Sequence, residues 1–197
     1  EIHERLVGSE MCIRDRSLTA TGLYLRETGL MAAPESTLIA PKNLRDMERL
    51  CFIRDFLLGF ISRDRVFSPE LAVIEGYAMG AKTHTHDLGE AGAMLKTAVY
   101  ETGIDLLIVP PATLKKFITG SGNSKKQVMM VEALSRYHVK ITDDNICDAF
   151  CLTHFGEAWY AANAFGRTAG GIGITKSQYA CLSAARLVPG RKRSSRR

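Results

Sequence analysis

Two short, unbroken apolar segments constrain the fold of this chain more than any other feature. They are Leu71–Glu75, which ends in a carboxylate, and residues 106–109, which two prolines follow. A continuous run of four or five apolar residues is typical of a strand buried on both faces of a sheet. Between them, apolar residues from Leu88 to Val99 recur at helical spacing. This order of strand, helix and strand predicts an α/β sheet with a parallel part.

The remaining segments extend the predicted sheet and its helices. Short strands are expected at residues 21–25 and 36–40, and a further short strand at 139–141. Amphipathic helices are expected over residues 44–61 and 146–162, the second with N-caps offered by residues 143–145. The lysine-rich segment 113–126 is interpreted as mainly a loop. Together these elements predict a mixed five-stranded sheet flanked by helices.

The length of 197 residues suits one compact domain. Residues 17–166 are expected to form it, and residues 167–197 a glycine-rich, basic C-terminal tail. Residues 1–16 do not resemble a natural domain start, because the letters of residues 11–15 match the translated end of a transposase sequencing adapter. We therefore expect residues 1–16 to be a non-native segment.

The positive net charge is concentrated near the C-terminus. The chain carries +5, and six basic residues from Arg186 onward leave a net charge of −1 for the rest. Such a basic run either contacts phosphates without sequence preference or is a solvated tail. No apolar stretch of about 20 residues and no signal peptide occur, so we expect a cytoplasmic protein that does not contact membranes. The five cysteines form no CxxC pair, and we predict no zinc site.

Two carboxylates occupy positions that are usually apolar in a protein core. Glu75 ends a buried strand, and Asp148 lies one turn inside an apolar helix. Each alone could be explained by a salt bridge or a cap, but two in one domain favour a metal site, because a divalent cation neutralises clustered carboxylates. Asp144 is four residues before Asp148 and shares its helix face, although it is also an ordinary helix-start residue.

The implied cofactor is a hard divalent cation. Ligands that offer only oxygen favour Mg²⁺ or Mn²⁺, and a pair of ions about 4 Å apart is a known solution for in-line phosphodiester displacement. The predicted substrate is therefore a nucleic acid.

Four motifs together resemble a known family. They are the Ser-Leu-Thr-Ala-Thr-Gly segment at 17–22, Val-Ile-Glu at 73–75, the Thr-Gly-x-Gly-Asn-x-Lys-Lys segment at 119–126 and Asp-Ala-Phe at 148–150. In this order they resemble RuvC-type Holliday junction resolvases, especially phage-like ones, over about residues 15–156. The resemblance implies an RNase H-like fold, a homodimer, and paired nicks at four-way DNA junctions that require magnesium and four acidic residues.

The family pattern assigns roles to residues of this chain. Glu75 matches the strand carboxylate, Asp148 the last helix carboxylate, and Asp15 the first-strand aspartate. The position three residues before Asp148 is usually acidic in the family, yet Asn145 stands there, and Asp144 would substitute if the helix start shifts. The expected catalytic and metal-binding set is thus Asp15, Glu75, Asp148 and Asp144.

Basic residues of the third motif are the expected DNA contacts. Lys115, Lys116, Lys125 and Lys126 would hold phosphates without reading sequence, and the alternative is a set of solvated lysines. Three histidines, at 84, 86 and 154, are interpreted as non-catalytic.

Two rival functions are consistent with the same residues. The first is a nuclease of the same fold that acts on another nucleic acid, because fold and metal site do not fix substrate shape. The second is a DNA-binding protein with an impaired metal site, which Asn145 and the unusual N-terminal segment favour.

Overall fold

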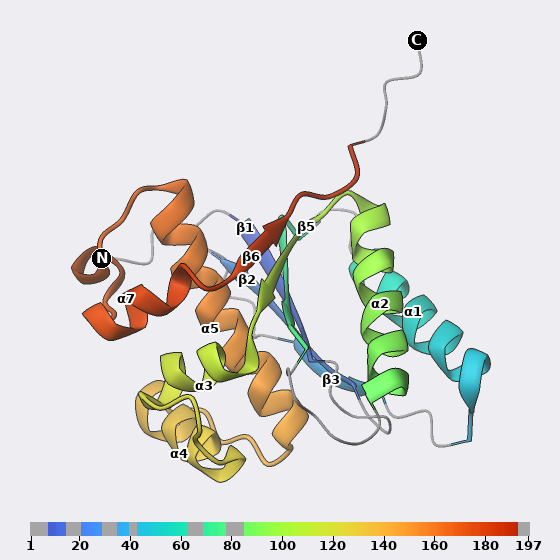
Figure 1. Cartoon of the computed structure of the whole chain (residues 1–197), viewed down its shortest axis with the longest axis horizontal. Coiled ribbons are helices and arrows are strands. Elements are labelled where there is room, and N and C mark those ends of the chain that lie inside the picture. The colour runs from blue at the N-terminus through green and yellow to red at the C-terminus, as the bar shows by residue number, and fades with distance from the viewer. Residues whose placement is uncertain are drawn as a thin grey trace.

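The computed structural model describes residues 8–14, 21–28, 35–39, 43–62, 69–77 and 85–192 (Figure 1). The strands are β1 (Gly8–Arg14), β2 (Thr21–Thr28), β3 (Glu35–Ile39), β4 (Leu71–Glu75), β5 (Asp105–Val109) and β6 (Arg186–Val188). The helices are α1 (Asp46–Ser62), α2 (Thr85–Thr102), α3 (Pro111–Thr119), α4 (Lys126–Tyr137), α5 (Asp144–Ala164), α6 (Ala169–Ile172) and α7 (Lys176–Leu182). In Figure 1, α1 and α2 cover one face of the sheet and α5 covers the other.

The sheet is mixed, as predicted, and its strands run in the order β3-β2-β1-β4-β5-β6. Strands β1, β4 and β5 are parallel, whereas β2, β3 and β6 pair antiparallel with their neighbours. Six strands stand where five were predicted. The segment 139–141 is irregular rather than a strand, because it is a short connection between two packed helices. The added strands are β1, which lies in the segment interpreted as non-native, and β6.

Alternation along β4 divides the buried residues into two cores. Leu71 and Val73 pack with α5, while Ala72 and Ile74 pack with α1 and α2. Successive strand side chains point to opposite faces, so a strand covered on both sides must be apolar at every position. Full burial of one Leu or Ile side chain contributes about 1.5–3 kcal/mol. These two cores fix β4 in the centre of the molecule.

Helix α5 is the longest element of the core that contains Leu71 and Val73. It begins where Asp143 accepts hydrogen bonds from the backbone nitrogens of Asn145 and Ile146, at 2.8 and 3.0 Å. A side chain in this role accepts hydrogen bonds from backbone N–H groups of the first turn, which have no acceptor within the helix. The helix then packs across β1, β2 and β4, and Phe155 meets Phe117 of α3 edge to face. Its residues are apolar on nearly every side because it is enclosed on nearly every side.

The described part of the predicted C-terminal tail, residues 167–192, contains two helices and a strand. Helix α7 places Cys181 and Leu182 in the core, and β6 extends the sheet at the edge of β5. Beyond β6, the backbone nitrogen of Gly190 donates to Asp105 Oδ1 at 2.9 Å. The composition of this segment suggested a tail, but its few apolar residues are enough to cover an open edge of the sheet.

Most of the predicted lysine loop is helical. Pro111 occupies the first turn of α3, where a missing N–H costs nothing, and Gly120 ends the helix with φ +83°. Only residues 120–125 connect α3 to α4. Among the helices that the structure describes, none is long and apolar enough to cross a membrane.

Candidate metal centre and nucleic-acid interface

Glu75 is the last residue of β4 and is partly buried. Because it follows the alternation of Leu71 and Val73, it belongs to the sheet face that α5 covers. Its Oε2 oxygen is shielded from solvent. The next residue, Gly76, donates to the carbonyl of Val109 at 2.7 Å, and a Cβ there would lie 3.2 Å from a methyl carbon of the neighbouring β5. Glycine thus lets the two parallel strands stay together just beyond the glutamate.

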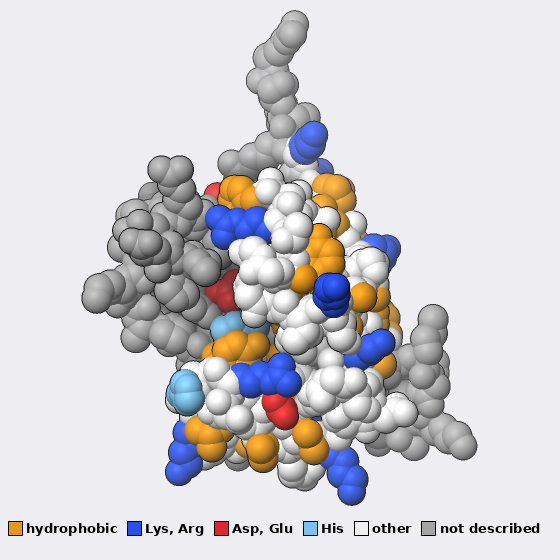
Figure 2. Space-filling view, turned by 90° about the vertical axis from the view of Figure 1, so that its left-hand side faces the viewer, with side chains coloured by type: hydrophobic (Ala, Val, Ile, Leu, Met, Phe, Trp, Pro, Cys, Tyr) orange, Lys and Arg blue, Asp and Glu red, His pale blue; other side chains and the backbone are white. Residues whose placement is uncertain are grey.

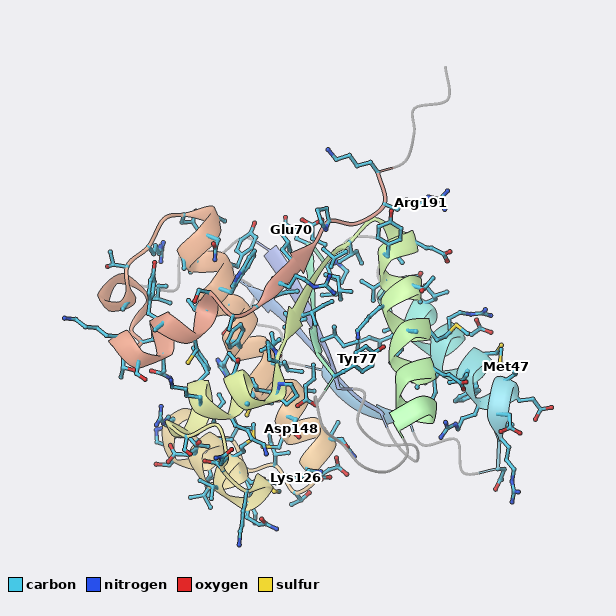
Figure 3. The ribbon with its side chains drawn as sticks, in the orientation of Figure 1. Met47, Glu70, Tyr77, Lys126, Asp148 and Arg191 are labelled. Atoms are coloured by element: carbon cyan, nitrogen blue, oxygen red, sulfur yellow. The ribbon has the colours of Figure 1, made fainter. Side chains whose placement is uncertain are left out.

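Asp148 comes to the same face from α5. Its side chain is 5 % exposed and lies among buried residues of the helix. Figure 3 shows it at the end of the sheet where β5 runs into α3, and Tyr77, two residues after Glu75, lies toward the same end. The carboxyl end of β4 and the first turns of α5 therefore present the two predicted carboxylates on one side of the sheet.

Asp144 and Asn145 differ sharply in their surroundings. Asp144 is at the exposed start of α5, where it forms an ion pair with Lys126 of α4. Asn145 is 8 % exposed and precedes Asp148 by three residues. The helix therefore buries the amide beside Asp148 and directs Asp144 to the surface, although both residues are close to Asp148 in sequence.

The fourth predicted residue, Asp15, lies outside the described residues. Within the described ranges, no three Asp, Glu, His or Cys side chains gather closely enough to hold a metal ion. The described donors are the Glu75 and Asp148 carboxylates, with the Asn145 amide one helical turn before Asp148. This donor set is all oxygen and suits a hard divalent cation. Two carboxylates on one buried face also fit such a cation, because it offsets the cost of burying negative charge.

The lysine segment, residues 115–126, lies on the same side of the sheet. Lys116, Lys125 and Lys126 are exposed, and Lys115 is partly buried. In Figure 2, Lys and Arg side chains are scattered over the side of the molecule where α3, α4 and α7 lie, with few Asp or Glu between them. A face of this kind attracts a polyanion at long range.

The connection inside the lysine segment is closely packed. Thr119 Oγ1 lies 2.6 Å from Ser124 Oγ and also donates to the carbonyl of Lys115 at 2.8 Å. A Cβ on Gly122 would lie 3.1 Å from the carbonyl oxygen of Ala112. The hydrogen bonds of Thr119 therefore tie the connection to the last turn of α3.

His154 is enclosed in an aromatic cluster. Its ring stacks on Tyr137 with a centroid separation of 3.9 Å and meets Phe150 edge to face. Its Nδ1 lies 3.0 Å from Glu157 Oε2. The residue therefore joins α4 to α5. His84 lies outside the described residues, and the side chain of His86 is likewise not described.

Tyr77 lies at the same end of the sheet as Glu75, contacts α2, and was not singled out from the sequence. It is 54 % exposed, its hydroxyl donates to the carbonyl of Gly89 at 3.1 Å, and Lys96 Nζ lies 3.6 Å from its ring centroid. An aromatic residue two positions after the strand carboxylate was the available signal. The sequence could not indicate the contact of Tyr77 with α2, because that contact joins residues far apart in sequence.

Comparison with known proteins connects this arrangement to a family. The family model described as "Crossover junction endodeoxyribonuclease RuvC" matches residues 20–154. A structure of Thermus thermophilus RuvC superposes with a TM-score of 0.62 at 18% identity, covering 79% of this chain and 96% of that chain. T. thermophilus RuvC in complex with a Holliday junction substrate gives a TM-score of 0.63 at 15% identity, covering 92% of this chain and 99% of that chain. No curated protein sequence matches.

The structural likeness shows the fold, which is the RNase H-like fold of RuvC. The family match covers well over half of the chain and includes β4, the lysine segment and the first half of α5. This chain belongs to the RuvC family of crossover junction endodeoxyribonucleases.

Proposed function

We propose that this chain resolves four-way DNA junctions by metal-dependent hydrolysis at a site built on Glu75 and Asp148. The observation that carries the proposal is that these carboxylates reach one buried side of the sheet from β4 and from α5. A site for a divalent cation explains them together.

Each residue has a proposed task. Glu75 and Asp148 supply carboxylate oxygens for the cation, and the Asn145 amide supplies a neutral oxygen beside them. Asp15 is proposed as a third carboxylate on the basis of its match to the family motif. Asp144 is a weaker candidate because its partner is Lys126.

A bound pair of Mg²⁺ or Mn²⁺ ions would supply Lewis acidity for water attack on phosphorus and for departure of the 3′ oxygen. The protein itself contributes by positioning the cation and the DNA strand. The carboxylates fix where the cation sits, and the enclosed site limits access of bulk water. Lys116 and Lys125 would hold the neighbouring phosphates of the DNA strand without reading its sequence.

The proposed substrate is a branched DNA, bound by a homodimer. Support comes from the matched T. thermophilus RuvC structure, whose description names a Holliday junction substrate. A two-fold pair presents the same site twice, which suits two symmetric nicks on one junction. Such a substrate also implies work in the cytoplasm of a bacterial cell or a phage-infected host.

The test is nicking of a labelled four-way junction, compared with a linear duplex and an RNA–DNA hybrid. We expect symmetric junction nicks in Mg²⁺ that disappear in chelator and in Glu75→Gln. Preferential cleavage of the hybrid would instead support a nuclease of the same fold with another substrate.

A second candidate function rests on one observation. Asn145 occupies the buried helix position next to Asp148 where an acidic residue is usual in the family. A neutral amide there weakens cation binding, and the chain would then bind junctions without cutting them. Tight junction binding with no nicks at any Mg²⁺ or Mn²⁺ concentration would favour this reading.

A further inference from the structure

Gln178 joins the C-terminal helix α7 to the end of α3. It is 9 % exposed, and its Nε2 donates to the carbonyl oxygen of Phe117 at 3.0 Å. The same side chain also completes the start of α7, because its Oε1 accepts from the backbone nitrogen of Thr175 at 3.0 Å. One buried side chain therefore serves two helices.

The carbonyl that Gln178 reaches is at a position where a helix needs an outside partner. The last turn of a helix leaves its carbonyls without intrahelical donors. In α3, Gly120 donates to the carbonyl of Lys116 at 2.9 Å, and Gln178 takes the next one, that of Phe117. The bond thus stabilises the final turn of α3, directly before the connection formed by residues 120–125.

Packing reinforces this single bond. Leu182 and Cys181 of α7 lie in the same core as Phe117 and Ile118 of α3. Burial raises the pKa of the Cys181 thiol, and nearby Lys116 acts in the opposite direction. Helix α7 therefore packs against α3, the helix that carries Lys116.

The connection beyond α3 is hydrogen-bonded to the end of that helix. Thr119 Oγ1 at the end of α3 lies 2.6 Å from Ser124 Oγ, which ties the connection to α3. A change at the end of α3 is therefore expected to reach the lysine segment through this hydrogen bond.

We propose that Gln178 is a positioning residue for DNA binding, which holds the lysine segment in its binding orientation through the carbonyl of Phe117. It lies outside residues 20–154, which match the family model. This inference rests on the proposed function, because it presumes that the lysines contact junction phosphates.

The test is a double-mutant cycle on junction affinity with the full chain. Gln178→Met keeps a similar volume and removes both the donor to Phe117 and the acceptor of the Thr175 nitrogen. We expect the Kd for a four-way junction to rise about threefold to tenfold, the range for losing one hydrogen bond. The nicking rate at saturating junction should stay within about twofold, because neither Glu75 nor Asp148 moves. In a background of Lys116→Ala with Lys125→Ala, the same Gln178→Met change should leave the Kd unaltered.

Thr175→Val is the matched control for the stability of α7. It removes the hydroxyl that accepts from the backbone nitrogen of Gln178 and donates to Gln178 Oε1, but it keeps the Nε2 donor to Phe117, so it should lower the Tm without changing the junction Kd. All affinities are measured at a temperature where every variant is folded by circular dichroism.

Each outcome decides between the claims. A Gln178→Met variant with a lower Tm and an unchanged Kd would overturn the inference, as would an equal loss of affinity in the background with Lys116→Ala and Lys125→Ala. If the lysine substitutions weaken binding but Gln178→Met does not, the proposed function stands and the positioning role is lost. A wild-type protein that does not bind the junction would overturn both.

Discussion

Magnesium should stabilise this protein against heat, and Asp148→Asn should abolish that effect. Asp148 is 5 % exposed, and Glu75 comes to the same face of the sheet from β4. A cation that binds the folded protein and not the unfolded chain adds about 2.7 kcal/mol at a concentration one hundred times its Kd. For a domain of this size that corresponds to a rise in Tm of about 5–10 °C.

In the absence of metal, the Asp148→Asn substitution should raise the Tm of the protein. Asn has nearly the same shape as Asp but carries no charge, so it removes one of two carboxylates buried on one side of the sheet. Loss of that unfavourable charge should raise the metal-free Tm of Asp148→Asn by about 2–4 °C, equivalent to roughly 1 kcal/mol. This pattern is expected of a residue that serves the chemistry of the site at a cost to the stability of the fold.

The assay is a thermal melt by circular dichroism in chelator and in a Mg²⁺ titration, for wild type and variant. Asp144→Asn is the matched control, because Asp144 is half exposed and paired with Lys126; it should keep the Mg²⁺-dependent rise. If Asp148→Asn melted lower than wild type in chelator and kept the full Mg²⁺ shift, Asp148 would be a structural residue and the site assignment would fail.

Three further outcomes are expected. Asn145→Asp should lower the Mg²⁺ concentration for half-maximal nicking several-fold, since affinity rises with ligand charge; an unchanged Mg²⁺ requirement would show that residue 145 faces away from the cation. Gly120→Ala should destabilise the fold by about 1 kcal/mol, because a side chain strains the φ of +83°, and a urea melt with an unshifted midpoint would contradict this. With iodoacetamide near pH 8, peptide mass spectrometry should find partly buried Cys51 modified well before Cys181, whose pKa is raised by burial. Equal rates for both would show that α7 opens readily.

The sequence predicted the central elements because their signals are local. The apolar run of β4 and the helical periodicity of α1, α2 and α5 arise from neighbouring residues, and the structure confirms each of these elements. Glu75 and Asp148 were identified for the same reason, since each is a carboxylate in an apolar local setting. Their role as metal ligands stays a prediction.

The errors came from contacts between distant residues. Segment 139–141 has the composition of a strand, but it pairs with none of the strands that the structure describes. The opposite holds for β6, whose short sequence gives little strand signal and which forms because the edge of β5 is open beside it. The C-terminal segment was interpreted as a tail because its glycines and arginines outweigh, in composition, the few residues that pack in the core.

By itself the sequence determined the α/β class, the strand and helix that carry the two carboxylates, and the family, because periodicity and short motifs are written in consecutive residues. Only the tertiary structure decided that Asn145 is buried while Asp144 pairs with Lys126, and that Gln178 reaches Phe117. Residues adjacent in sequence can differ completely in burial, because the neighbouring elements on each side of a helix, and not its own residues, set which of its faces is enclosed.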